Sequence, residues 1–272
     1  MKILIVSGFL GAGKTTFIKR LARNVDQRFA ILENEYGAAG IDGARLGQNR
    51  QGTQKNVWEM TEQCICCIGK KDFAASVLTI ANVVDPEYLI VEPTGVGSLA
   101  RIIENLRQIE YERIQLLSPV TIVDVYSYRR YMAEYPELYQ DQIRSADTII
   151  VSKTEACQAE EKQRIQKFLQ EINPQAKIIT DYASTMTRED YQSLLLGGRY
   201  EKKVQDTQSG EKMPETFSFE NIRMEAPETL WCFLEQIIRG AFGNIIHAKG
   251  QDRKSTRLNS SHHFISYAVF CL

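Results

Sequence analysis

The fold of this chain is decided by its N-terminal segment, Lys2-Ile3-Leu4-Ile5-Val6-Ser7-Gly8-Phe9-Leu10-Gly11-Ala12-Gly13-Lys14-Thr15-Thr16. The apolar first half predicts a buried strand. The second half matches Gly-x-x-x-x-Gly-Lys-Ser/Thr, the pattern of a phosphate-binding loop between a strand and a helix. Glycines let the backbone come close to a phosphate chain, and the N–H groups of the loop and of the helix start then face the anion. The segment therefore predicts a P-loop that binds a nucleotide.

The predicted loop assigns roles to individual residues. Lys14 would reach the β- and γ-phosphates, and the hydroxyl of Thr15 would ligate Mg²⁺. A later apolar strand ends in Glu92, in the place of the aspartate that contacts Mg²⁺ or its water in such sites. Gly95 would then donate its backbone N–H to the γ-phosphate. We expect Lys14, Thr15 and Glu92 to be catalytic, and the nucleotide to be contacted by Gly8, Gly11, Ala12, Gly13, Lys14, Thr15, Thr16 and Gly95.

A second nucleotide-binding motif is expected late in the same domain, at Ser152-Lys153-Thr154-Glu155. It follows an apolar strand, where a base-reading loop would lie. The Glu155 carboxylate would accept hydrogen bonds from the N1–H and the exocyclic amine of guanine, while the aliphatic stem of Lys153 covers the ring. We therefore expect Ser152, Lys153 and Glu155 to contact the base, with GTP and GDP as the ligands.

Three cysteines within four residues, Cys64, Cys66 and Cys67, form a third motif. The chain shows no secretory signal, so metal or redox chemistry is favoured over disulfides. Thiolates select zinc, cobalt or copper(I). A structural zinc site would need four protein ligands, and no second Cys-x-x-Cys follows. The motif predicts an open metal site in which Cys64 and one of the other two cysteines are the favoured pair, completed by a carboxylate, water or a partner; buried or redox-sensitive thiols are the alternative.

The composition is that of an ordinary globular protein and excludes several classes. Hydrophobic residues make up 43% of the 272 residues and charged residues 25%, which is enough to bury a sizeable core. The net charge of -1 argues against nucleic-acid binding through bulk electrostatics. No apolar run approaches the length of a membrane span, and the N-terminus reads as a strand rather than a signal peptide. We expect a cytoplasmic protein that binds neither nucleic acid nor membranes.

Strand and helix patterns alternate along most of the chain, which predicts an α/β fold, a P-loop NTPase with a mostly parallel sheet flanked by helices. We assign residues 1–196 to this GTPase domain and the polar residues 197–214 to a linker. Residues 215–251 read as the opening of a smaller, truncated α+β domain. Residues 252–272 look like a translated sequencing-library adapter, which predicts a non-native tail; a natural basic tail is the alternative.

Two groups of residues are interpreted as packing rather than chemistry. A tyrosine stripe at helical spacing, which commonly lines a core, is formed by Tyr128, Tyr131, Tyr135 and Tyr139. Cys157 and Cys232 lie in helical surroundings and are expected to be small buried residues.

These motifs occur in the order seen in CobW-like proteins, which belong with the hydrogenase- and urease-maturation GTPases among P-loop metallochaperones. The chain resembles this family from Met1 to Gly250, through its P-loop, Glu33-Asn34-Glu35-Tyr36-Gly37, Cys64-Ile65-Cys66-Cys67, Glu92-Pro93-Thr94-Gly95 and the late Lys-x-acid motif. The resemblance implies GTP hydrolysis coupled to binding and delivery of zinc, cobalt or a similar ion. By motif match, the metal ligands are Cys64, Cys66 and Cys67, with Glu33 as an accessory ligand. The implied partner is a client metalloprotein or a metal-inserting enzyme.

The sequence departs from the family pattern at two positions. Glu155 stands where the base motif usually ends in Asp, so the preference for GTP over ATP stays open. Ala38 stands where many relatives carry an acid, which removes one candidate ligand.

No arginine finger or catalytic base can be assigned from the sequence, so we expect slow intrinsic GTP hydrolysis. The three cysteines lie between the first switch segment and the Glu92 strand, so loss of the γ-phosphate would reorder the metal ligands. Two alternatives remain, a P-loop kinase of a small molecule and a non-catalytic metal-sensing module. The metal, the client and the oligomeric state, a homodimer included, stay open.

Overall fold

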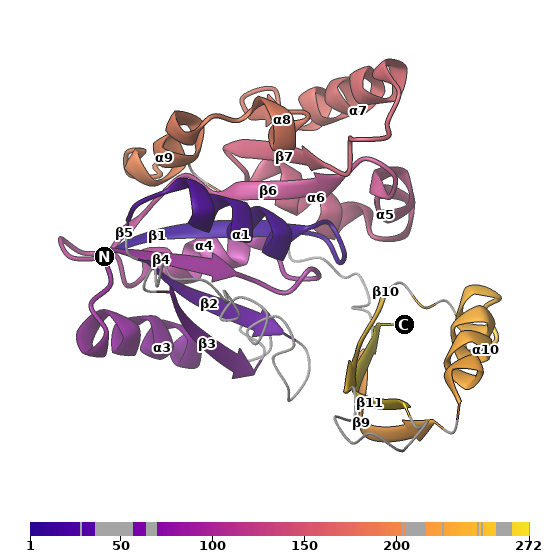
Figure 1. Ribbon diagram of the computed structural model, residues 1–272. Helices are drawn as coiled ribbons and strands as arrows, with labels where there is room; N and C mark the ends of the chain where they lie inside the picture. Colours follow the sequence, from indigo (N-terminus) through magenta and orange to yellow (C-terminus); the bar gives the residue numbers. More distant parts are fainter. Residues whose placement is uncertain are drawn as a thin grey trace.

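Figure 1 shows the computed structural model of the chain, which describes residues 1–27, 29–35, 57–63, 70–202, 204, 216–224, 226–243, 245, 247–253 and 263–271. Within these residues the larger sheet is built from β1 (Lys2–Gly8), β2 (Phe29–Glu35), β3 (Val57–Gln63), β4 (Tyr88–Glu92), β5 (Gln115–Leu116), β6 (Val120–Asp124), β7 (Thr148–Ser152) and β8 (Lys177–Ile179). The strand order is β3-β2-β4-β1-β6-β7-β8, and the short β5 pairs with β1 beside β6. The strand pairs are parallel. The prediction of an α/β fold with a mostly parallel sheet is confirmed.

Helices cover both faces of this sheet, because the strands of a parallel sheet bury side chains on both sides. They are α1 (Lys14–Asn24), α3 (Lys70–Val83), α4 (Leu99–Arg107), α5 (Tyr128–Glu134), α6 (Pro136–Arg144), α7 (Ala159–Ile172), α8 (Tyr182–Thr185) and α9 (Arg188–Leu196). Among the helices that the structure describes, none is both long and apolar enough to span a membrane.

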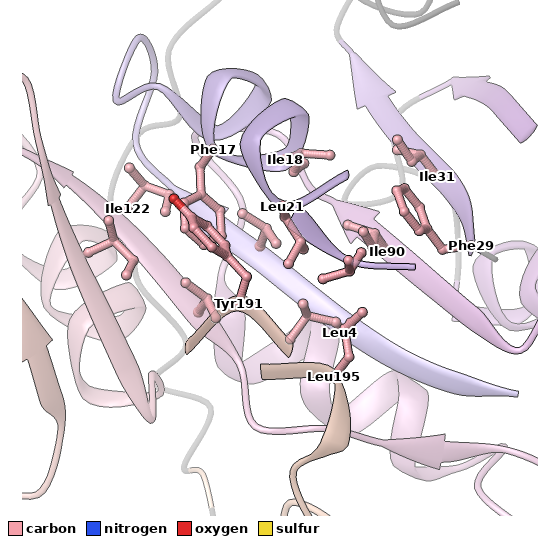
Figure 2. Packing of buried hydrophobic residues seen from close by; sticks show 14 of the residues in the cluster. Leu4, Phe17, Ile18, Leu21, Phe29, Ile31, Ile90, Ile122, Tyr191 and Leu195 are labelled. Atoms are coloured by element: carbon pink, nitrogen blue, oxygen red, sulfur yellow. The ribbon is translucent and has the colours of Figure 1, made fainter. Parts of the chain in front are cut away.

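The central strand β1 sends alternate side chains into two cores. Ile3 and Ile5 pack in one cluster with apolar residues of α3 and α4. Leu4 and Val6 face the other side, toward α1 and α9. Figure 2 shows this second core, in which Leu4 and Ile90 of the sheet lie among residues of the two helices, Phe17, Ile18, Leu21, Tyr191 and Leu195. The strand is apolar along its length because both of its faces are buried, and this holds the P-loop at its end on a rigid base.

The tyrosine stripe is confirmed as packing. Tyr128, Tyr131 and Tyr139 are buried in a third cluster with apolar residues of β6, β7 and α7, and Tyr135 packs against it. Phe9 of the P-loop joins this cluster, with its ring centroid 4.2 Å from that of Tyr131. The tyrosine stripe therefore packs against the P-loop through Phe9.

The chain remains packed against the domain beyond α9. Tyr200 is buried, with only 3% of its surface exposed, and its hydroxyl donates to the backbone oxygen of Ser145 at 2.8 Å. The ammonium of Lys202 donates to the backbone oxygen of Arg144, also at 2.8 Å. The side chain of Arg107 donates to the backbone oxygen of Lys202. The first residues after α9 are thus tied to the ends of α4 and α6.

A second, smaller unit contains β9 (Thr216–Met224), α10 (Pro227–Ile238), β10 (His247–Arg253) and β11 (His263–Cys271). Its strands form an antiparallel sheet in the order β10-β11-β9. Residues 215–251 contribute a helix and two strands, but β9 and β10 are joined only through β11, which lies outside that range. Cys232 was expected to be buried, and that expectation is wrong, because it lies on an exposed side of α10 beside Trp231, which is 73% exposed. The sequence of α10 is apolar around much of the helix and so does not indicate which side faces the protein.

Strand β11 falls within residues 252–272, where the sequence predicts a tail derived from an adapter. The pairing of β10 with β11 is irregular between Gln251 and Asp252, where that predicted tail begins. Strand pairing uses backbone groups that almost any sequence carries, so it does not bear on the origin of the segment. The tail and the domain boundaries stay predictions.

Candidate functional site

The P-loop joins the end of β1 to the start of α1, as the sequence predicts. Gly8 has a φ of 143°, and a Cβ placed there would lie 2.4 Å from the backbone oxygen of Ile122 in the neighbouring strand. The position therefore excludes any side chain. Gly13, with a φ of 100°, is the N-cap of α1, and no side chain caps that helix end. Backbone N–H groups at a helix start form an arrangement that binds phosphate.

The side chain of Lys14 lies over the loop itself. Its ammonium donates to the backbone oxygens of Gly8 at 3.0 Å and Phe9 at 3.3 Å. A phosphate oxygen is a stronger partner for an ammonium than a neutral carbonyl, because both partners are then charged. The lysine is thus already positioned at the loop that would hold the β- and γ-phosphates.

Thr15 and Glu92, 77 residues apart in the chain, come into contact at the start of α1. The Thr15 hydroxyl donates to the two carboxylate oxygens of Glu92 at 3.1 and 3.3 Å. Glu92 is buried at the end of β4, and its backbone is in register with Glu33 of the neighbouring β2. Hydroxyl and carboxylate oxygens are the ligands that Mg²⁺ prefers, so the residues present fit a magnesium ion bound beside the P-loop.

The loop that follows Glu92 lies directly against the P-loop. A Cβ added to Gly95 would lie 2.5 Å from the backbone nitrogen of Leu10 and 2.8 Å from its Cα. Thr94 and Val96 are buried on either side, and the N–H of Gly97 closes a turn by donating to the oxygen of Thr94 at 3.1 Å. Backbone from two loops therefore meets where a γ-phosphate would be expected.

The predicted base motif begins at the end of β7 and is joined to the P-loop. The buried hydroxyl of Ser152 donates to the backbone oxygen of Ala12 at 2.6 Å. Lys153 has a φ of 60°, a left-handed conformation that costs a residue with a side chain about 1–3 kcal/mol. Its ammonium donates to Asp124 at 2.6 Å, whereas Glu155 is exposed. The motif thus holds its lysine in place and leaves the Glu155 carboxylate exposed.

A turn after β8 lies against the same motif. Asp181 accepts a hydrogen bond from Lys162 at 2.6 Å. This bond, together with one from the Thr154 hydroxyl, lowers the pKa of the Asp181 carboxyl below its ordinary value. Thr154 is buried between Lys153 and Glu155, so these contacts fix the backbone from which both side chains project.

The remaining predicted site residues fall partly outside the described structure. Cys64, Cys66 and Cys67 lie outside the described residues, and Glu33 is described only through its backbone in β2. Thr16 is exposed at the start of α1. Within the part of the chain that the structure describes, no three His, Cys, Asp or Glu side chains gather into a metal site.

Two residues that hold the site together were given no role from the sequence. Asp124 holds Lys153, and it also accepts from the backbone N–H of Tyr126 and the hydroxyl of Ser127, both at 2.9 Å. Asp124 stands at the end of an apolar strand, as Glu92 does, and this signal could have marked it. The side-chain amide of Gln142 in α6 donates to the backbone oxygens of Gly95 and Gly97. Gln142 lies inside an amphipathic helix, where no sequence pattern distinguishes it.

The family model described as CobW/HypB/UreG, nucleotide-binding domain, matches residues 2–180, which is more than half of the chain. The chain belongs to this family. The matched residues of this CobW/HypB/UreG domain include the P-loop, the cysteine motif, Glu92 and the base motif. The resemblance stated from these motifs is confirmed over residues 2–180, and its extension to Gly250 stays a prediction.

Similar proteins carry names that relate to zinc. The zinc chaperone YeiR of Escherichia coli (strain K12) is 30% identical over 178 residues, covering 64% of this chain and 53% of that protein. The zinc chaperone CobW of Pseudomonas aeruginosa is 27% identical over 194 residues, covering 61% of this chain and 52% of that protein. The chain therefore spans about half the length of these curated relatives.

Among solved structures, the Zn(II)-bound YjiA GTPase from Escherichia coli has a TM-score of 0.54 and 17% identity, and covers 100% of this chain and 93% of that one. At this level of identity the likeness concerns the fold, and it agrees with the P-loop domain described here.

Proposed function

We propose that this chain is a metal chaperone that binds GTP with Mg²⁺, hydrolyses it slowly and couples the transfer of a zinc ion to the state of the nucleotide. The observation that carries the proposal is the contact between Thr15 and Glu92 at 3.1 Å. It joins a P-loop hydroxyl to a buried carboxylate in a chain of the CobW/HypB/UreG family. The names of the curated relatives support zinc as the ion, with cobalt as the second candidate.

The nucleotide chemistry is one of position and charge, as phosphoryl transfer requires. The ammonium of Lys14 exchanges the oxygens of Gly8 and Phe9 for the phosphates. A magnesium ion held by Thr15 and, directly or through water, by Glu92 would neutralise charge on the β- and γ-oxygens. Gly95 directs a backbone N–H to the γ-phosphate. In the base motif, Lys153 covers the guanine ring and Glu155 accepts from its edge.

The metal to be delivered is bound by Cys64, Cys66 and Cys67, with Glu33 as an accessory ligand. Parallel strands end at a common edge, and β3 ends at Gln63, next to β2, which pairs with β4 and its terminal Glu92. The cysteine motif follows Gln63 directly in the sequence. This arrangement supports coupling, because the cysteine motif leaves the sheet from β3, which is separated from β4 and Glu92 only by β2.

The test measures zinc affinity of the purified chain with a non-hydrolysable GTP analogue and with GDP. We expect the two affinities to differ, and we expect zinc binding to be lost when Cys64, Cys66 and Cys67 are all changed to Ser. Cys232→Ser is the matched control, since that thiol is exposed and lies outside the motif. Cobalt is titrated in parallel to rank the two metals.

Three outcomes would contradict the proposal. Equal zinc affinity with both nucleotides removes the coupling. If the Lys14→Ala variant still hydrolyses GTP at the original rate, the hydrolysis does not take place at the P-loop. A preference for ATP with a product that depends on an added acceptor favours a small-molecule kinase instead.

A further inference from the structure

Helix α6 carries two adjacent buried polar side chains that face the loop after Glu92. Gln142 is 1% exposed, and its amide nitrogen donates to the backbone oxygens of Gly95 and Gly97, each at 3.0 Å. These residues lie 47 and 45 positions earlier in the chain. One side-chain amide therefore fixes the orientation of two peptide groups in the turn that touches the P-loop.

The second residue, Asp141, holds the other end of the same loop. Its carboxylate accepts from the backbone N–H groups of Leu99 at 2.7 Å and Ala100 at 3.4 Å, in the first turn of α4. A carboxylate at a helix start is favoured by the unpaired N–H groups and the positive end of the helix dipole. Asp141 and Gln142 together, which we call the α6 clamp, thus hold the loop from Gly95 to the start of α4.

The clamp is itself anchored to the sheet and works beside a contact with the P-loop. The backbone oxygen of Gln142 accepts from the Thr121 hydroxyl of β6 at 2.9 Å. From the preceding helix α5, the hydroxyl of Tyr131 donates to the backbone oxygen of Leu10 at 3.1 Å. Leu10 is the residue against which Gly95 packs. The α5–α6 pair therefore contacts both loops at the place where they meet.

The two ends of the Gln142 amide are used differently. Within the described residues, its side-chain oxygen is buried and has no hydrogen-bond partner. Both donors of the amide nitrogen are used, and both go to the loop after Glu92. The hydrogen bonds of this side chain therefore orient the two glycine carbonyls.

We propose that the α6 clamp positions the Gly95 loop against the P-loop and so sets how strongly this protein distinguishes GTP from GDP. The inference rests on the proposed function, since it assumes that Gly95 serves the γ-phosphate. Gln142 and Asp141 are positioning residues in this scheme, because they act through the loop and not on the nucleotide. GDP lacks the γ-phosphate, so its affinity does not depend on the clamp.

The experiment compares the dissociation constants of a non-hydrolysable GTP analogue and of GDP in the full chain. Gln142→Met removes the amide donors while keeping a similar length and shape. We expect about a tenfold weaker binding of the GTP analogue, in line with the loss of a buried hydrogen-bond pair, and a GDP affinity within about twofold of the original. Asp141→Asn keeps the shape of the side chain and removes its negative charge. We expect this variant to change the ratio of the GTP-analogue and GDP dissociation constants by about threefold.

Asn173→Leu is the matched control. Asn173 is also a buried amide, and it donates to the backbone oxygens of Ile143 and Ala146 just beyond the clamp, at 2.8 and 2.9 Å. This variant is expected to lower the melting temperature and to leave the ratio of the two affinities unchanged. A change in that ratio which is specific to the clamp variants supports the inference.

The outcomes separate the clamp from the proposed function. The clamp inference is contradicted, and the proposed function stands, if the unaltered chain distinguishes GTP from GDP and both clamp variants bind GDP and show the same affinity ratio as the unaltered chain. If Asn173→Leu changes the ratio as much as Gln142→Met does, the effect is one of general stability and the clamp is again overturned. If the unaltered chain binds neither nucleotide, the proposed function fails and the clamp fails with it.

Discussion

The contact between Gly95 and Leu10 gives the sharpest prediction, because a single methyl group tests it. In Gly95→Ala, the new Cβ would lie 2.5 Å from the Leu10 nitrogen, which is 0.9 Å less than the 3.4 Å at which ordinary contact begins. The backbone nitrogen and Cα of Leu10, at 2.5 and 2.8 Å, belong to the P-loop and cannot rotate away. One of the two loops must therefore move by close to 1 Å.

A displacement of about 1 Å at a reacting group costs roughly 10²-fold in rate, or about 2.7 kcal/mol of transition-state stabilisation. We expect kcat/KM for GTP in Gly95→Ala to fall by about this factor, measured by phosphate release. Overpacking is expected to lower the free energy of unfolding by about 1–3 kcal/mol, so the assay is run well below the melting temperature.

Two other glycines provide a graded control. An added Cβ at Gly97 would lie 3.3 Å from the Thr94 hydroxyl, and one at Gly198 would meet nothing within 4 Å. We expect Gly97→Ala to lose part of the activity and Gly198→Ala to keep it. If Gly95→Ala retained kcat/KM within threefold of the original chain, the close approach of the two loops would not matter for turnover.

Three more predictions concern other contacts. Lys14→Ala is expected to reduce GTP turnover by about 10²–10³-fold, measured by phosphate release, because a preorganised charge at the phosphates is lost. Asp181 has a lowered pKa through its bond from Lys162, so its stabilisation is present above the ordinary value of 3.8 and is lost as the pH falls through the lowered pKa. Thermal melting should therefore show a larger difference between Asp181→Asn and the original chain at pH 7 than at about pH 3. Tyr200→Phe removes the bond to Ser145 and should cost about 1 kcal/mol in chemical denaturation.

The parts of the site that could be predicted from the sequence are those set by local pattern. The glycines at 8 and 13 mark a loop whose backbone geometry admits almost no other residue, so the P-loop can be recognised without any knowledge of its neighbours. Glu92 follows from a run of five buried strand residues that ends in an acid, since acids at the carboxyl ends of parallel strands meet at one edge.

The remaining contacts depend on how distant segments pack. Gln142 contacts the Gly95 loop only because α6 packs against that loop. The spacing of apolar residues along the helix does not distinguish Gln142 from a surface glutamine. Lys153 was expected to cover a base, but the sequence does not show that Asp124, 29 residues earlier, holds its ammonium. The exposed position of Cys232 was missed for a related reason, since residue type alone does not fix which side of a helix is covered.

The anchoring of Tyr200 and Lys202 bears on how the nucleotide domain should be produced by itself. A protein shortened after Leu196, the boundary suggested by residue composition, would lose an aromatic ring from its interior and the partner of Arg107. Such a fragment is expected to express poorly or to aggregate. Val204 also packs against the core, so the earliest stop codon that leaves the interior intact comes after Val204.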